Sequence, residues 1–461
     1  MARILFWNIQ TFGINKINDP SRKRPAGYGG LTCAQAAQMR ETVLARVFMA
    51  AVPDIIVIVE VASGNTWPSD LASTTGGMAG ANYILGELRQ GNPNRNWRLV
   101  PPLRIGRTPG SKPETVAILY SGTSSDGQTR RYFTGPNWWQ GQYNGTSFEP
   151  NAGIANNYPN GGVGLPDINA MVVPPGSNAR QIPNGALHNV GRYENQVAAR
   201  TAFQILDEPG EYLDFGVYRP PYMATFTETD AHDAVQRNLA IFGVHSPAVA
   251  GDAGVFITYL SQAEDVAGPL GANETRVIGG DFNLNMLAAD GSNSGVYDNL
   301  PNYAPLLSSP GAPPAANLER YKGYFTTHMK PASATATSRF LWSDTPNDSP
   351  YPGYGYIGSH FVNNFYSIDN ILVRPHQGAP YNYETTIMNY IAGAPFANPP
   401  NNAPPGTINM LSGFYNALIA WPPQPDAPQT IFPGTRNNLI SWPNYGYLYG
   451  TSDHFAVYAT V

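Results

Sequence analysis

Short runs of β-branched and aromatic residues recur along the whole chain, and they constrain the fold more than any other feature of the sequence. Each run is five to eight residues long. This length and composition are typical of buried strands, because β-branched and aromatic side chains pack well on a pleated surface. The sequence therefore predicts eight strands, at Arg3–Ile9, Asp54–Glu60, Thr115–Ser121, Tyr222–Phe226, Leu239–His245, Arg276–Asp281, Ser367–Arg374 and His454–Val461.

Two segments between these runs have the apolar periodicity of an amphipathic helix. One lies between the first two predicted strands, and the other is expected over Gly254–Ala267. Strands that alternate with helices and also adjoin other strands predict an α/β protein with mixed sheets. The apolar helix positions are Met39, Val43, Leu44, Val47, Phe48 and Ala51 in the first segment, and Val255, Phe256, Tyr259, Leu260, Ala263 and Val266 in the second.

Three long segments rich in Pro, Gly, Asn and Tyr separate some of these elements. Charged residues make up only 13% of the chain, which predicts ordered, uncharged loops because disorder needs low hydrophobicity and high net charge. A structureless loop of such length is uncommon in a compact domain. We therefore interpret residues 122–218, 284–366 and 375–450 as insertions in a single catalytic domain that spans residues 1–461.

The charge is distributed unevenly along the chain. The net charge of −5 by itself argues against a dedicated nucleic-acid-binding protein. Residues 1–131, however, carry 15 Lys and Arg against 8 Asp and Glu, while the other 330 residues carry 12 against 24. This basic surplus is either a solvated face or a contact surface for a phosphate backbone. Its clustered members are Lys16, Arg22, Lys23, Arg24, Arg89, Arg95, Arg98, Arg104, Arg107, Lys112, Arg130 and Arg131.

Cysteine usage and hydropathy exclude several classes of protein. The single cysteine, Cys33, forms no intramolecular disulfide, and the chain has no histidine–cysteine zinc motif. No stretch reaches the ~18 apolar residues of a membrane helix. The N-terminus runs directly into apolar residues, with no charged region and no cleavage site typical of a signal peptide. We therefore expect a cytoplasmic protein, export by a leaderless route, or a chain from which a leader has been removed, and no protein partner is indicated.

Polar residues of similar kinds stand at the ends of the predicted strands. An α/β sheet presents side chains to a ligand at its strand ends, so these residues predict one site. Each motif by itself is weak, because Gly-Asp-Phe-Asn, for example, is also a common turn sequence. The motifs are Trp7-Asn8, Glu60, Gly243-Val244-His245-Ser246, Gly280-Asp281-Phe282-Asn283, Ile368-Asp369-Asn370 and Ser452-Asp453-His454.

In this order the motifs resemble the endonuclease/exonuclease/phosphatase superfamily, and most closely its DNase I branch. The stretches that resemble this branch are Val244-His245-Ser246-Pro247-Ala248, Arg219-Pro220-Pro221-Tyr222 and Lys112-Pro113-Glu114. The Pro-Ala-Trp-Cys-Asp signature of inositol 5-phosphatases is absent around Asp369. The resemblance implies a DNase I-like four-layered α/β sandwich, in which two packed mixed sheets are flanked by helices and carry long loop insertions.

The resemblance also implies a role for each motif residue. Glu60 and Asp453 would hold Mg²⁺, or alternatively Mn²⁺ or Ca²⁺, with Asn8, Asp281 and Asn283 completing a polar floor that also contacts the phosphate. Glu114 would orient His245, and Asp369 would orient His454. The resemblance favours His454 as base and His245 as acid, with the reverse assignment open and Asp281 as another candidate to orient the water. Arg219 would clamp a phosphate.

These features favour a non-sequence-specific endonuclease that acts on nucleic acid, with DNA as the first candidate. The first alternative is a sphingomyelinase-like or phosphoinositide phosphoesterase that meets a lipid surface through the nearly uncharged segment 375–450. The second is a catalytically inactive binding protein, which is expected to have lost some of the site residues. The remaining histidines are interpreted as structural; they are His188, His232, His328, His360 and His376.

Overall fold

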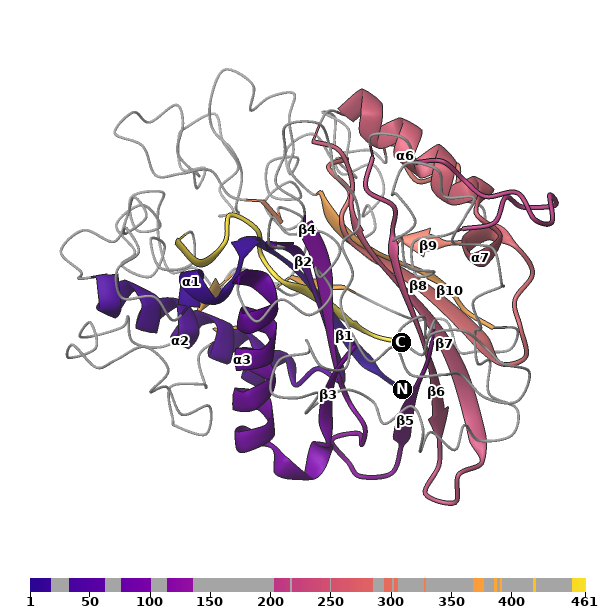
Figure 1. The fold of residues 1–461 in the computed structure, drawn as a ribbon. Coiled ribbons are helices and arrows are strands. Elements are labelled where there is room, and N and C mark those ends of the chain that lie inside the picture. Colours follow the sequence, from indigo (N-terminus) through magenta and orange to yellow (C-terminus); the bar gives the residue numbers. More distant parts are fainter. Residues whose placement is uncertain are drawn as a thin grey trace, which may run out of the picture.

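The computed structural model describes two six-stranded sheets and the helices that cover them (Figure 1). The described residues are 1–17, 33–62, 76–100, 114–135, 203–215, 218–248, 250–284, 294–300, 302–305, 327–328, 368–376, 385–387, 390–391, 418–419 and 450–461.

The first sheet has the strand order β11-β14-β1-β2-β4-β3. β1 and β2 are parallel, and the other neighbours in this sheet are antiparallel. Residues of β1 and β2 are almost wholly buried, as expected for strands covered on both faces. The strands span β1 Arg3–Phe12, β2 Ile55–Ala62, β3 Trp97–Val100, β4 Glu114–Ser121, β11 Thr386–Ile387 and β14 Val457–Thr460.

The second sheet has the order β5-β6-β7-β8-β10-β9 and repeats this arrangement. β7 and β8 form its parallel pair, and the other neighbours are antiparallel. A separate two-stranded ribbon joins β12 (Tyr390–Ile391) to β13 (Leu418–Ile419). The strands of the second sheet span β5 Arg130–Gly135, β6 Tyr222–Thr229, β7 Val235–His245, β8 Glu274–Asp281, β9 Ala304–Pro305 and β10 Asp369–Arg374.

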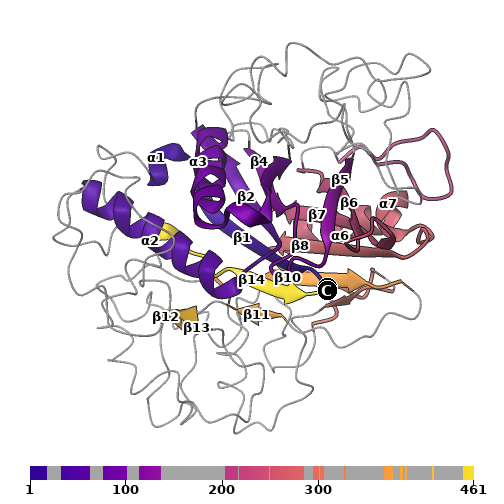
Figure 2. The same ribbon diagram turned by 90° about the horizontal axis from the view of Figure 1, so that it is seen from below.

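Helices lie on the outer faces of both sheets (Figures 1 and 2). α1 (Ile14–Ile17), α2 (Cys33–Ala51) and α3 (Gly76–Gly91) lie beside the first sheet, and a short 3₁₀ helix (Pro93–Arg95) follows α3. α6 (Ala250–Gln262) and α7 (Glu264–Ala267) lie beside the second sheet. The predicted four-layered α/β sandwich is confirmed. No helix among the described residues is long and apolar enough to cross a membrane.

All eight predicted strands and both predicted helices are present, with differences in extent. The second helix is divided at Ala263, and Val255, which was expected on its apolar face, is 43% exposed. We did not predict α3, which is rich in helix-breaking glycine, or the strands β3 and β5, which are short and contain arginine. The predicted insertions are not wholly outside the core, because they contain the edge strands β5, β9 and β11.

The two sheets lie close together at glycines of β7 and β8. A Cβ atom on Gly243 would lie 2.9 Å from the side chain of Val116 and 3.0 Å from that of Val57, both in the first sheet. A Cβ atom on Gly279 would lie 2.5 Å from the ring of Phe6 in β1. These positions have no room for a side chain, so glycine sets the distance between the sheets.

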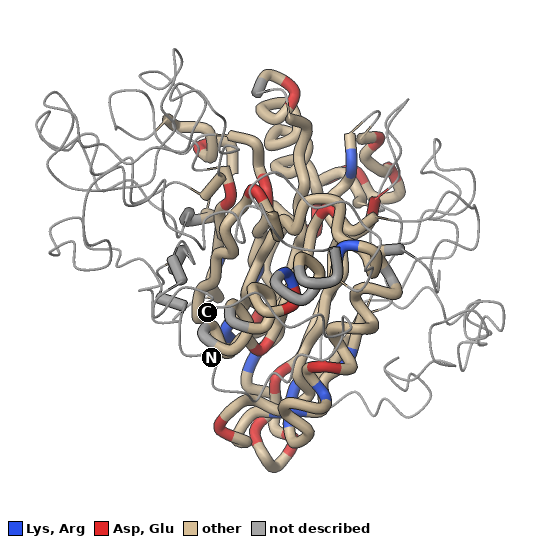
Figure 3. Tube along the Cα trace, turned by 90° about the vertical axis from the view of Figure 1, so that its left-hand side faces the viewer, with Lys and Arg blue, Asp and Glu red and all other residues tan. Residues whose placement is uncertain are grey.

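Part of the N-terminal basic surplus serves the interior of the protein. Arg95 pairs with Asp54 at 2.5 Å, and Arg131 pairs with Glu228 at 2.5 Å, with all four residues buried. Lys16 is also buried. In the lower part of Figure 3, described Lys and Arg positions lie among Asp and Glu positions. The prediction of a phosphate-contact surface is therefore wrong for Lys16, Arg95 and Arg131, which are buried. Other members of the cluster lie outside the described residues: Arg22, Lys23, Arg24, Arg104, Arg107 and Lys112.

Replacing Gly279 with alanine tests the contact between the sheets. We expect Gly279→Ala to lower the free energy of unfolding by ~1–3 kcal/mol, because the added methyl group overpacks the interface against Phe6. Gly254→Ala is the control, because it adds the same group to α6 with no atom within 4 Å and is expected to stabilise the protein by ~1 kcal/mol. Urea denaturation measures both, and equal effects of the two substitutions would contradict the assigned contact.

Replacing Glu228 with glutamine tests the buried ion pairs. Burial by itself would raise the pKa of Glu228, but the charges of Arg131 and Arg237 outweigh it and lower the pKa from 4.5 to about 2. The carboxylate therefore stabilises the fold fully above pH 4.5, and this contribution is lost as the pH falls through about 2. We expect Glu228→Gln to cost ~3–5 kcal/mol at neutral pH, because it removes the counter-charge that the buried Arg131 and Arg237 share.

The comparison with wild type is made by urea denaturation at neutral pH and again near pH 3. The deficit of Glu228→Gln should shrink at the lower pH. Glu208→Gln removes a carboxylate from an exposed turn and should change stability little at either pH. A deficit that is independent of pH would show that the charge of Glu228 is not what stabilises this region.

Candidate active site

The strand register brings site residues of both sheets to one edge. In the second sheet His245 lies opposite Asp281, and Asp281 lies opposite Asp369 on its other side. In the first sheet Glu114 lies opposite Ala62, two residues after Glu60. β4 and β10 run antiparallel to β2 and β8, so their first residues, Glu114 and Asp369, lie beside the last residues of these strands.

His245 is held by Glu114 across the two sheets. Its Nδ1 atom lies 3.0 Å from Oε1 of Glu114, and the side chain of Arg219 also contacts this carboxylate. Its Nε2 atom lies 3.7 Å from Oδ2 of Asp281 and 3.9 Å from Oε1 of Glu60. The bond at Nδ1 fixes the ring so that Nε2 points toward these two acidic groups.

His454 has the same arrangement on the other side of Asp281. Its Nδ1 atom lies 2.8 Å from Oδ2 of Asp369, and its Nε2 atom lies 3.7 Å from Oδ2 of Asp281. The backbone N–H of Asp369 donates to the hydroxyl of Thr327 at 3.0 Å, and the indole N–H of Trp7 donates to the carbonyl of His454 at 2.9 Å. These bonds hold the backbones of Asp369 and His454 in place, and so position the two side chains that form the pair.

Asp281 lies between the two histidines and is only 2% exposed. The amide Nδ2 of Asn8 donates to its Oδ2 at 3.0 Å, and the backbone N–H of Asn283 donates to its Oδ1 at 2.9 Å. Both carboxylate oxygens are thus held by groups from different sheets or loops. Among the described residues, Asp281 is the side chain whose carboxylate lies 3.7 Å from Nε2 of both imidazoles, so it marks the centre of the site.

Two of the predicted site residues have unusual backbone conformations. Glu60 has φ of 56° and Asn283 has φ of 49°, both in the left-handed region. Such conformations cost free energy for residues other than glycine and are concentrated at functional sites. Thr11 donates its N–H to Oε2 of Glu60 at 3.3 Å, and the side-chain amide of Asn283 donates to the carbonyl of Ser246 at 3.1 Å.

The oxygen atoms of the site suit a hard divalent cation. Within the part of the chain that the structure describes, Oδ1 of Asn8 and Oδ1 of Asp453 are buried and accept no hydrogen bond. Buried acceptors are normally satisfied, so these two atoms are candidates for metal ligands. Glu60 and Asp453 do not belong to one cluster, however: Glu60 groups with Glu114 and His245, and Asp453 groups with His328 and His454.

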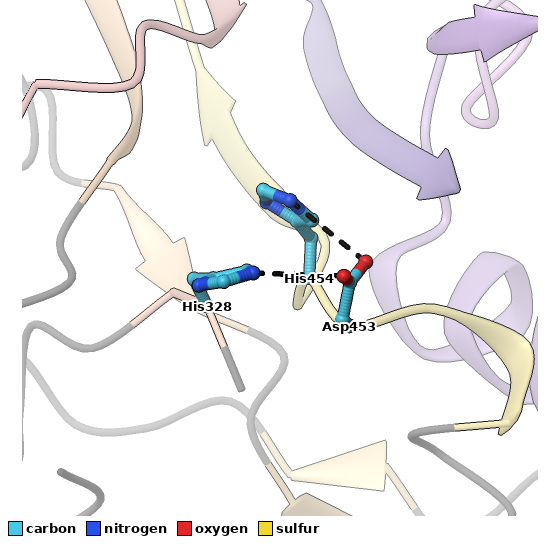
Figure 4. A group of neighbouring side chains, drawn as sticks. All are labelled: His328, Asp453 and His454. Atoms are coloured by element: carbon cyan, nitrogen blue, oxygen red, sulfur yellow. Dashed lines mark ion pairs between the residues drawn. The ribbon is translucent and has the colours of Figure 1, made fainter. Parts of the chain in front are cut away.

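His328, which was interpreted as structural from the sequence, lies beside Asp453 and His454 in the structure (Figure 4). Its Nε2 atom lies 3.6 Å from Oδ2 of Asp453, and its ring centroid lies 4.5 Å from that of His454. His328 lies in a predicted insertion and outside any predicted strand, so no sequence pattern pointed to it. His232 lies in an exposed turn and His376 contacts Thr275, while His188 and His360 lie outside the described residues.

The pKa values of the two histidines are shifted in opposite directions although the rings are placed alike. Burial, and then the positive charge of Arg219, lower the pKa of His245 below its ordinary value. Burial would also lower the pKa of His454, but the carboxylates of Asp369 and Asp281 outweigh it and raise the pKa to about 10. Burial would raise the pKa of Asp453, but the neighbouring rings of His328 and His454 lower it to about 2.

Fold and site together define a four-layered α/β sandwich with carboxylates and histidines gathered at one edge of both sheets. No protein-family model matches the chain, and no curated protein matches it. Among solved structures, the chain is similar to an endonuclease/exonuclease/phosphatase family protein from Leptotrichia buccalis, with 10% identity and a TM-score of 0.38 over 100% of this chain and 99% of the other.

Two further solved structures are similar at the same level. One is TDP2 of D. rerio in complex with a single-strand DNA product, with 9% identity and a TM-score of 0.33 over 99% of this chain and 97% of the other. The other is a mannosyl-6-phosphatase of Bacteroides thetaiotaomicron, with 12% identity and a TM-score of 0.34 over 100% and 99%. At these values the similarity leaves the activity undecided, so only the site carries information on function.

Replacing Arg219 with glutamine tests the electrostatics of the site. The charge of Arg219 helps to lower the pKa of His245, so we expect Arg219→Gln to raise that pKa toward the ordinary value of 6.5. The pKa is measured by NMR titration of the ring protons in metal-free protein. Arg130→Gln, which removes an exposed arginine paired with Asp233, is expected to leave the titration unchanged. An unchanged titration in Arg219→Gln would contradict the contact.

Proposed function

We propose that the protein is a divalent-metal-dependent phosphodiesterase and that it hydrolyses nucleic acid, with DNA as the first candidate. One observation carries the proposal: two imidazoles present their Nε2 atoms to the same carboxylate, Asp281, at 3.7 Å each. Hydrolysis of a phosphodiester needs one group that takes a proton from water and one that protonates the leaving oxygen. The two imidazoles, one on each side of Asp281, meet this requirement.

The pKa directions support a division of roles between the histidines. The lowered pKa of His245 keeps its ring neutral near neutral pH, so its Nε2 is available to accept a proton from water. The raised pKa of His454 keeps that ring protonated, so it is suited to protonate the leaving oxygen. We therefore propose His245 as base and His454 as acid, the reverse of the assignment that the resemblance favours. Glu114 and Asp369 orient the two rings, and Asp281 positions the water between them.

The divalent cation would be held by oxygen atoms at this edge. Glu60, Asp453 and the unsatisfied Oδ1 of Asn8 offer the carboxylate and carbonyl oxygens that Mg²⁺ prefers; because Glu60 and Asp453 lie in separate clusters, each is a ligand candidate in its own cluster. A bound cation withdraws charge from the phosphate oxygens and so makes the phosphorus more open to attack. Arg219, beside Glu114, is the proposed contact for a further phosphate oxygen.

The choice of nucleic acid rests on the motifs that resemble the DNase I branch. The basic surplus gives this choice less support than the sequence suggested, because several of its members are buried in ion pairs. Of the segment 375–450, which favoured a lipid substrate, only five short stretches are described. The alternative phosphoesters are therefore kept as outcomes of the experiment.

Nicking of supercoiled plasmid tests the activity and the roles of the residues together. We expect wild-type protein to nick the plasmid in Mg²⁺ and not in EDTA. His245→Ala and Asp281→Asn should each lower the rate by ~10²–10⁴-fold, the usual contribution of a positioned acid or base. His232→Ala removes an exposed histidine and should retain the wild-type rate.

The same proteins distinguish the alternatives. A folded wild-type protein that nicks no plasmid in Mg²⁺, Mn²⁺ or Ca²⁺ would exclude DNA, and RNA, sphingomyelin and phosphoinositides would be tested next. Loss of hydrolysis on all of these substrates would leave the inactive binding protein as the remaining interpretation. Nicking that persists in Asp281→Asn would show that the reaction occurs elsewhere on the protein.

A further inference from the structure

We propose that His328, Asp453 and His454 form a binding site for a transition-metal ion of the zinc type, and that an ion bound there inhibits the enzyme. The binding follows from the three side chains alone. The inhibition rests on the phosphodiesterase function proposed above.

The three side chains are spaced as ligands of one ion (Figure 4). Their ligand atoms all lie within 4.8 Å of one another. Nε2 of His328 lies 3.6 Å from Oδ2 of Asp453, and Nε2 of His454 lies 3.9 Å from Oδ1 of the same carboxylate. These separations are too long for hydrogen bonds. They are close to the about 3.4 Å that separates two ligands of a tetrahedral ion with bonds of about 2.1 Å.

Two of the ligands are already oriented by groups behind them. Nδ1 of His454 is bonded to Asp369 at 2.8 Å, which leaves Nε2 as the atom that faces the cluster. A carboxylate behind a histidine is the usual support for a zinc-bound imidazole. Gln10 donates to Oδ2 of Asp453 at 3.0 Å, while Oδ1 of Asp453 is buried and accepts no hydrogen bond among the described residues. The cluster therefore contains an unsatisfied acceptor in a supported position.

The backbone places His328 in this position. The N–H of Phe455 donates to the carbonyl of Thr327 at 2.7 Å, and His328 forms an antiparallel bridge with His454. The side chains of His328 and Asp453 are 23% and 18% exposed, so the cluster opens to solvent on that side. An ion can reach the cluster without any movement of the two sheets.

The ligand types separate this site from the proposed magnesium site. Two imidazoles and one carboxylate suit zinc and similar ions, whereas Mg²⁺ prefers oxygen ligands throughout. Three carboxylates, those of Asp281, Asp369 and Asp453, lie near His454 and favour a cation at this place. Both sites use Asp453, and an ion that binds Nε2 of His454 must displace the proton that this ring would donate to the leaving oxygen. Zinc would therefore inhibit the reaction rather than support it.

Direct binding tests the site without any assumption about activity. The full chain is stripped with EDTA, and zinc affinity is measured by competition with a chromophoric chelator. Cobalt is then added in place of zinc, because a four-coordinate cobalt site absorbs visible light far more strongly than aqueous cobalt. We expect one strong site in wild type and the visible absorption of four-coordinate cobalt.

Four variants assign the ligands. His328→Gln and Asp453→Asn should each weaken zinc binding by about 100-fold or more and abolish the cobalt absorption, since loss of even an outer partner typically costs ~10–100-fold. His245→Gln, on the other side of Asp281, and His232→Gln, in an exposed turn, should bind zinc as wild type does. Thermal unfolding confirms that each variant is folded, and Asp453→Asn serves as the test if His328→Gln is not. Wild-type affinity in both His328→Gln and Asp453→Asn, or a loss in His245→Gln alone, would overturn the proposal.

Zinc is also added to the plasmid assay, with each variant compared with its own rate in Mg²⁺ alone. Inhibition of wild type that is weaker by about 100-fold in His328→Gln supports the inhibitory role. Zinc binding without any nicking by wild type would overturn the proposed nuclease and leave the metal site intact. Equal inhibition of wild type and His328→Gln would overturn the inhibitory role.

Discussion

The close approach of the two sheets is the constraint on which the site depends. Gly243 and Gly279 leave no room for a side chain between β7 or β8 and the opposite sheet. This contact holds the parallel pair of one sheet against the parallel pair of the other. The ends of the parallel pairs β1/β2 and β7/β8 then lie at the same edge of the two sheets. At this edge Glu60 lies near His245, and Asn8 donates to Asp281.

Among the described residues, buried ion pairs and the candidate active site use charge in different ways. Buried arginines pair with Asp54 and Glu228 and contribute to stability. The candidate active site has an excess of carboxylates, and Arg219 is the arginine that contacts one of them. Such an excess of negative charge disfavours an anionic substrate until a cation is bound, which agrees with a metal-dependent reaction.

The same excess of carboxylates gives the site two possible responses to metal ions. Oxygen atoms at its centre suit Mg²⁺, while the rings of His328 and His454 beside Asp453 suit zinc. Both ions would compete for one carboxylate. The balance between them would make activity depend on which metal is available, with no conformational change of the fold.

The sequence by itself determined the fold class and the candidate residues at the strand ends. Periodicity identified the buried strands, because each is a short apolar run with a polar residue at its end, and the chain order of these residues carried the resemblance. Only the tertiary structure showed that His328 meets Asp453 and that Arg95 and Arg131 are buried in ion pairs. Local patterns report which face of a strand or helix is buried. They do not report which side chain from a distant part of the sequence lies against that face. Such contacts depend on how the sheets pack and on where long loops place residues such as His328.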